Sequence, residues 1–272
     1  MDDAEVLVLL VSVALAGLYL FTWYWTVLSS WPPERGRSGK VVLGVLPVCA
    51  LVIFIFTLTT LASFDVVGSS VYIFFYVVLG FAWMYLGVCL ITIFFDVSWE
   101  DDILNSNNQS ALFTFTGGFL GVAVIYSAAN IGDGPGWWCV IFAGGLGTFA
   151  WVLFALLLNG AANVFERVTI DRDISCGVRS GCFLLASGIL LGRASAGDWT
   201  SASMTVIEFL DGWPVLPLAA MAIAVERYYI GAVKRERSDS LPGSIFAGVF
   251  FVLFAVACVV LLPPLPVNPA YG

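Results

Sequence analysis

Four charged residues around the turn between two apolar segments are the first candidates for chemistry: Arg193, Asp198, Glu208 and Asp211. Charged groups at membrane depth are costly, and they often mark the path of an ion or a solute. They therefore suggest a charged vestibule that binds or conducts an ion or a small polar solute. The alternative is a structural ion pair between Arg193 and either Glu208 or Asp211, with side chains that reach toward the membrane interface.

The composition excludes several other kinds of site. The 272 residues include no histidine, so there is no imidazole base, no His-ligated haem and no zincin-type site. The six cysteines form no CxxC pair, and we interpret them as small buried residues in the reduced state. A net charge of -8 with 11 basic residues argues against binding to nucleic acid. We expect no cofactor, no metal site and no enzymatic activity.

The apolar segments predict an all-α fold, a polytopic transmembrane helix bundle. Hydrophobic residues make up 60% of the chain and charged residues 11%, whereas about 25% of the residues in soluble domains are charged. A helix needs roughly 20 apolar residues to cross the hydrocarbon core of a bilayer. Stretches of this kind lie at 5–28, 41–63, 70–95, 111–130, 137–163, 178–197, 204–230 and 244–264. We expect one membrane domain, residues 1–272, of four hairpins at 5–63, 70–130, 137–197 and 204–264.

The basic residues predict how the bundle is oriented. Ten of the 11 follow an odd-numbered span, and basic residues concentrate in cytoplasmic loops. We therefore expect both termini to be periplasmic. The ten residues are Arg35, Arg37, Lys40, Arg167, Arg172, Arg179, Arg227, Lys234, Arg235 and Arg237.

Two stretches of the chain indicate an internal repeat at an offset of 71 residues. The identical pairs are Val97 and Val168, Asp102 and Asp173, Ile103 and Ile174, Gly117 and Gly188, Leu120 and Leu191, and Gly121 and Gly192. Each copy has two glycines four residues apart, which places them on one helix face. Small residues at this spacing let helix backbones approach closely in a membrane. We interpret these four glycines as helix-packing seams.

An Asp-Ile dipeptide precedes the glycines in each copy, on the side expected to be cytoplasmic. We expect an interfacial segment in which Ile103 and Ile174 dip toward lipid while Asp102 and Asp173 stay in water. Together with Asn107, these residues form a candidate cytoplasmic motif.

The chain has an acidic residue before Ile, a small residue and Asn a few positions later, and then a Gly-rich helix. A hairpin with this pattern resembles the YjfL-like family of bacterial inner-membrane proteins, whose function is unknown. The matching residues are Asp102, Ile103, Ser106, Asn107, Gly117, Gly118 and Gly121, then Asp173, Ile174, Gly177, Gly188 and Gly192, with Val178 in place of the second Asn. The resemblance covers residues 95–230. It implies a bacterial inner membrane and no known activity.

Two prolines predict a bend in the seventh span. Pro214 and Pro217 each remove a backbone donor, so the helix should bend or open near Asp211.

Two functions are compatible with these features. The first is a non-enzymatic structural or interaction subunit, surrounded by membrane lipid, that forms a homo-oligomer or joins a larger membrane complex through the glycine seams. The second is an ion channel or small-solute transporter that uses the charged vestibule. A transporter needs polar residues through the midplane, and the charges concentrate near the membrane faces, which favours the subunit.

Overall fold

The structure, a computed structural model, describes residues 2–30, 37–233 and 240–270. Helices make up 82% of the described residues, which confirms the all-α class. The α-helices are α1 (Asp3–Ser29), α2 (Arg37–Thr60), α3 (Phe64–Val67), α4 (Ser70–Phe95), α5 (Gln109–Ala128), α6 (Trp137–Ala162), α7 (Val164–Thr169), α8 (Ile174–Ala194), α9 (Ala202–Glu208), α10 (Val215–Val233) and α11 (Leu241–Leu261). A π-helix, η1 (Trp99–Asn105), precedes α5, and a 3-10 turn, η2 (Phe209–Gly212), precedes α10.

The long helices make this a multi-pass membrane protein. In the described ranges, seven helices are long and apolar enough to cross a bilayer. An eighth span is broken: residues 202–212 and 215–231 meet at an angle of 41°. The break falls at Trp213 and Pro214, where the proline ring cannot donate to the preceding turn, so the predicted bend is confirmed.

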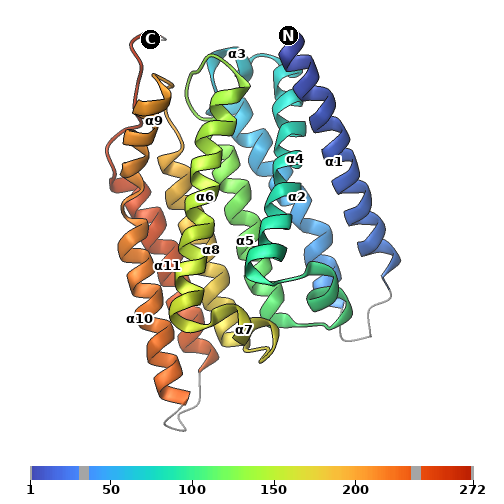
Figure 1. The fold of residues 1–272 in the computed structure, drawn as a ribbon, viewed down its shortest axis with the longest axis vertical. Coiled ribbons are helices and arrows are strands. Elements are labelled where there is room, and N and C mark those ends of the chain that lie inside the picture. Colours follow the sequence, from blue (N-terminus) through green and yellow to red (C-terminus); the bar gives the residue numbers. More distant parts are fainter. Residues whose placement is uncertain (1, 31–36, 234–239, 271–272) are drawn as a thin grey trace.

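Helices α5 and α8 form the centre of the bundle. In each of them 78% of the most apolar stretch is buried, against 22% in α1 and in α11. Helices α1, α2 and α4 lie on one side of this pair, and α10 and α11 lie on the other (Figure 1). Both termini lie at one end of the bundle, and α7 lies at the opposite end (Figure 1).

The closest packing joins helices from different predicted hairpins. Helix α5 packs most extensively against α8, and α1 packs more extensively against α4 than against α2. Sequence neighbours are joined by connections at the ends of the bundle, whereas the core is built between helices far apart in the chain.

The four predicted seam glycines all lie between α5 and α8. A Cβ atom on Gly117 would overlap the carbonyl of Gly181, and one on Gly188 would lie 2.5 Å from the Cα of Gly121. Gly192 faces Ala128 in the same way. These contacts lie within one chain and are buried, so the four glycines pack α5 against α8. The homo-oligomer stays a prediction.

Candidate functional site

The connections at the α7 end of the bundle place the predicted cytoplasmic motif. Asp102 lies in η1, where its carboxylate accepts a hydrogen bond from Ser98 N at 2.8 Å. Burial raises the pKa of Asp102, and this hydrogen bond acts in the opposite direction. Asp173 is instead the N-cap of α8 and accepts from Cys176 N at 3.0 Å. The two aspartates therefore have different structural roles, one within η1 and the other as the cap of α8.

The expectation for the two isoleucines was wrong for one of them. Ile103 is 1% exposed and lies under α2, so close that a Cβ atom on Gly39 would touch it, whereas Ile174 is 42% exposed. Asn107 has a φ of 50° and accepts a hydrogen bond from the Gln109 side chain at 2.9 Å. It shapes the turn into α5.

Residues that are identical at an offset of 71 do not occupy equivalent places in the backbone. The helix caps that match between the two copies are separated by shorter offsets. Asp96 and Asn163 are both left-handed C-caps, 163 - 96 = 67 residues apart. Asn108 and Asp173 are both N-caps of central helices, 173 - 108 = 65 residues apart. The internal repeat itself stays a prediction.

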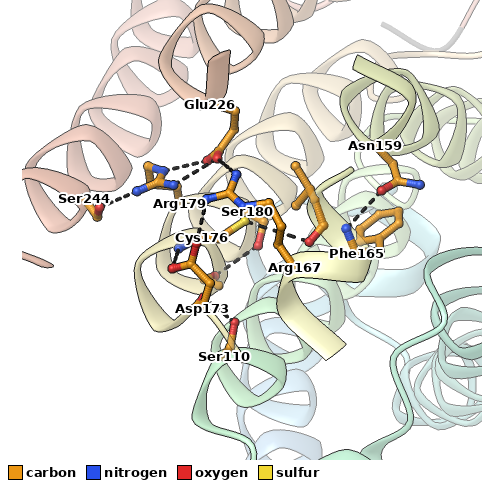
Figure 2. Close-up of polar contacts among 12 residues, drawn as sticks. Ser110, Asn159, Phe165, Arg167, Asp173, Cys176, Arg179, Ser180, Glu226 and Ser244 are labelled. Atoms are coloured by element: carbon orange, nitrogen blue, oxygen red, sulfur yellow. Dashed lines mark hydrogen bonds and ion pairs between the residues drawn. The ribbon is translucent and has the colours of Figure 1, made fainter. Parts of the chain in front are cut away.

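A buried ion-pair network lies beside α7 and joins four helices (Figure 2). It consists of Arg167, Asp173, Arg179, Glu226 and Ser244. Arg179 donates to Glu226 through Nε at 2.6 Å and through Nη2 at 2.9 Å. Arg167 donates to Glu226 at 2.7 Å and to Asp173 at 2.6 Å. Arg179 also donates to the hydroxyl of Ser244 on α11, and its guanidinium lies 4.1 Å from the ring centre of Tyr229.

The network balances its own charge, with two guanidinium groups against two carboxylates. The side chains of Arg179 and Glu226 are 0% and 3% exposed. A buried charge is tolerated only when it is paired and hydrogen-bonded, and the forked guanidinium suits a carboxylate in two-point contact. The network therefore fixes α7 and α8 to α10 and α11.

The sequence interpretation missed this network. It assigned Arg179 to a cytoplasmic loop, but α8 begins at Ile174 and carries Arg179 on its second turn, inside the helix. It did not consider Glu226, although this residue lies within the predicted span 204–230. An ionisable residue inside a span was the signal that could have found it.

A cavity of about 350 Å³ opens at the other end of the bundle, where both termini lie. Five carboxylates line it, those of Glu5, Asp65, Asp133, Asp198 and Glu208. Its lining includes no lysine or arginine of the described ranges. This acidic cavity contains two of the four predicted vestibule residues, Asp198 and Glu208.

The junction of two connections holds Asp133 and Asp198 in place. Asp133 N donates to the Asp198 carboxylate at 2.8 Å, and Trp199 N donates to the Asp133 carbonyl at 2.7 Å. Gly132, at φ 105°, and Gly197, at φ 126°, let the two backbones touch, because a Cβ atom on Gly132 would overlap the carbonyl of Gly197. Both carboxylates are thereby fixed in the wall of the acidic cavity.

The opposite wall is formed by α1 and α4. Glu5 stands in the first turn of α1, where it forms a capping box with Asp2, and the hydroxyl of Tyr72 approaches it at 3.5 Å. Tyr76 lies one turn further along α4 and also lines the acidic cavity. It is 7% exposed.

The remaining two vestibule residues do not join the acidic cavity. Arg193 donates to the carbonyl of Pro263 at 2.6 Å, and within the described ranges no carboxylate lies within 4.0 Å of it. Asp211, in η2, does not line the cavity. The ion pair expected between Arg193 and Glu208 or Asp211 is therefore wrong, because the arginine finds a backbone acceptor from the segment after α11.

Comparison of the sequence with protein-family models, with curated proteins and with solved structures found no match. The resemblance to the YjfL-like family stays a prediction.

Proposed function

We propose that this chain is a non-enzymatic multi-pass membrane protein, a channel or small-solute transporter, that takes a small cationic solute into the acidic cavity as the first step of its passage. The observation that carries the proposal is the cavity itself. Five carboxylates from separate elements line one space of about 350 Å³, and no described lysine or arginine lines it.

Carboxylates gathered around a hollow attract cations and repel anions. Low-dielectric walls focus the field of such charges and raise the local concentration of an oppositely charged solute. Asp133 and Asp198 already accept backbone hydrogen bonds, but a carboxylate has about four acceptor positions, so each keeps the capacity to bind a donor. The cavity therefore favours a cation that also donates hydrogen bonds.

The ion-pair network supports the same proposal from the other half of the bundle. Ionisable residues inside a membrane domain are expensive and are typical of proteins that move ions or solutes. Arg179 and Glu226 lie between helices and not toward lipid, as residues of a transport domain do. The sequence interpretation placed the charges near the membrane faces, and this network adds two ionisable residues within helices α8 and α10.

We also propose that the membrane is the bacterial inner membrane and that the acidic cavity opens to the periplasm. The positions of the basic residues support this orientation. An impermeant maleimide should label Thr200→Cys, on the connection between α8 and α9, in intact cells. It should label Asp171→Cys, in the connection before α8, only after lysis. Labelling of Asp171→Cys in intact cells would reverse the orientation.

The proposal predicts loss of cation uptake when the cavity is neutralised. Proteoliposomes with the whole chain should take up at least one of three labelled probes, ⁸⁶Rb⁺, ⁴⁵Ca²⁺ or ¹⁴C-spermidine, above protein-free liposomes. The double variant Asp65→Asn with Glu208→Gln should lower uptake by about tenfold or more, since each lost charged acceptor weakens binding by roughly 1.5–3 kcal/mol.

The matched control is Asp211→Asn, which removes a carboxylate three residues from Glu208 but outside the cavity lining. It should leave uptake unchanged. Uptake of no probe by the wild-type chain, or equal loss in the control and the double variant, would contradict the proposed function.

A further inference from the structure

We infer that the ion-pair network is a closed gate in the cation path, and that the broken span, α9 to α10, couples this gate to the acidic cavity. Opening of the network at the α7 end of the bundle is accompanied by closure of the acidic cavity at the other end. The inference rests on the proposed function, because it names how passage out of the cavity is controlled.

The broken span reaches both places. Glu208, the last residue of α9, lines the acidic cavity, and Glu226 of α10 belongs to the network. They are 226 - 208 = 18 residues apart. Along a helix this is about 27 Å, close to the thickness of the hydrocarbon core. A change in the angle between α9 and α10 therefore acts on both ends of the bundle.

The joint between the two halves of this span is suited to bending. The halves meet at 41°, and Pro214 and Pro217 remove two backbone donors there. Just before the joint, Gly212 packs against α8, where an added Cβ atom would lie 3.0 Å from that of Ala194. The joint thus combines a close contact on α8 with a weakened backbone ladder, and hinges of this kind allow one element to tilt against another.

Helix α10 is held at its far end by polar contacts and along its length by apolar ones. Leu218, Ala219 and Ala222 are buried between the joint and Glu226. Contacts of such side chains involve no hydrogen bond that a small tilt of the helix would break. Glu226 supplies the directional contacts, the hydrogen bonds at 2.6, 2.7 and 2.9 Å to the two arginines of the network. These bonds hold α10 in the closed position.

Two native cysteines report on the two ends of the bundle. Cys176 is 0% exposed and lies beside the network, with its Sγ 3.8 Å from the carbonyl of Val164 (Figure 2). Cys139, on α6, lines the acidic cavity. Opening of the gate exposes the first thiol and, through the broken span, covers the second.

The test measures the rate at which a charged maleimide labels each thiol, read separately by mass spectrometry of the two peptides. It uses the whole chain in lipid nanodiscs, with the other four cysteines replaced by alanine and with no probe cation added. Glu226→Gln should raise the rate at Cys176 by about tenfold and lower the rate at Cys139 by about threefold, because each rate follows the population of the state that exposes the thiol. Glu166→Gln, an exposed change on α7, is the matched control and should alter neither rate.

Pro214→Ala tests the coupling through the broken span. Alanine restores the missing N–H and favours a continuous helix. When it is combined with Glu226→Gln, the rate at Cys176 should still rise, whereas the rate at Cys139 should return to the wild-type value. An equal fall at Cys139 with and without the proline would show that the span does not link the two ends.

The remaining outcomes separate this inference from the proposed function. No change at Cys176 in Glu226→Gln would overturn the gate. If both thiols became more reactive, the charge-balanced change Arg179→Met with Glu226→Leu decides, and a rise at Cys176 without a fall at Cys139 would overturn the inference. Cation uptake by proteoliposomes without reciprocal labelling would overturn the gate and leave the proposed function. Reciprocal labelling in a chain that takes up no cation would support the coupled movement and contradict the proposed function.

Discussion

Glu226→Gln is expected to lower the free energy of unfolding by about 3 to 5 kcal/mol, the cost of breaking a buried ion pair by removing one partner. Glu226 accepts from both Arg167 and Arg179, and its side chain is 3% exposed. A glutamine keeps one oxygen, but its amide nitrogen would face guanidinium N–H groups, donor against donor. Two arginines would then share the single charge of Asp173. Thermal or denaturant unfolding in detergent measures the loss.

Two further variants decide whether the loss comes from charge imbalance. Glu166→Gln, an exposed change on α7, should have little effect. The double change Arg179→Met with Glu226→Leu should recover much of the lost stability, because Arg167 keeps Asp173 at 2.6 Å and the remaining charges balance. Equal stability of Glu226→Gln and Glu166→Gln would mean that the network is not formed in the folded protein in detergent.

Gly117→Ala is expected to destabilise the bundle by about 1–3 kcal/mol or more, because one methyl group must fit where two backbones already touch. The added Cβ atom would meet the carbonyl of Gly181, and no side-chain rotation can relieve a contact with backbone. Helices α5 and α8 would have to separate along their length. A lower melting temperature, with a larger loss for Gly117→Val, checks the prediction.

Gly145→Ala is the matched control for this change. Gly145 lies in α6 with nothing within 4 Å of its Cβ position. Alanine there should be neutral or stabilising by about 0.5–1 kcal/mol, since it favours the helix. If the melting temperature of Gly117→Ala were equal to or higher than that of Gly145→Ala, the contact between α5 and α8 would be looser than the structure describes.

The sequence by itself determined the features that depend on local composition. Hydropathy located each long helix to within a few residues, because the cost of exposing peptide groups to lipid acts on every span separately. The break at Trp213 and Pro214 followed from a missing N–H in the same turn. The glycines were found as packing positions because only small residues allow backbones to touch, whatever the partner helix is.

Tertiary structure decided which groups meet. Glu226 lies 47 residues from Arg179 and Asp198 lies 65 residues from Asp133, and the hydropathy of the separate spans does not pair them. Arg193 was assigned a carboxylate from the nearest turn, yet it donates to Pro263, 70 residues away. Ile103 was assigned to lipid from its place beside a span, but α2 covers it. Burial and charge compensation act through space between helices packed out of sequence order, so only the folded bundle assembled the ion-pair network at one end and the acidic cavity at the other.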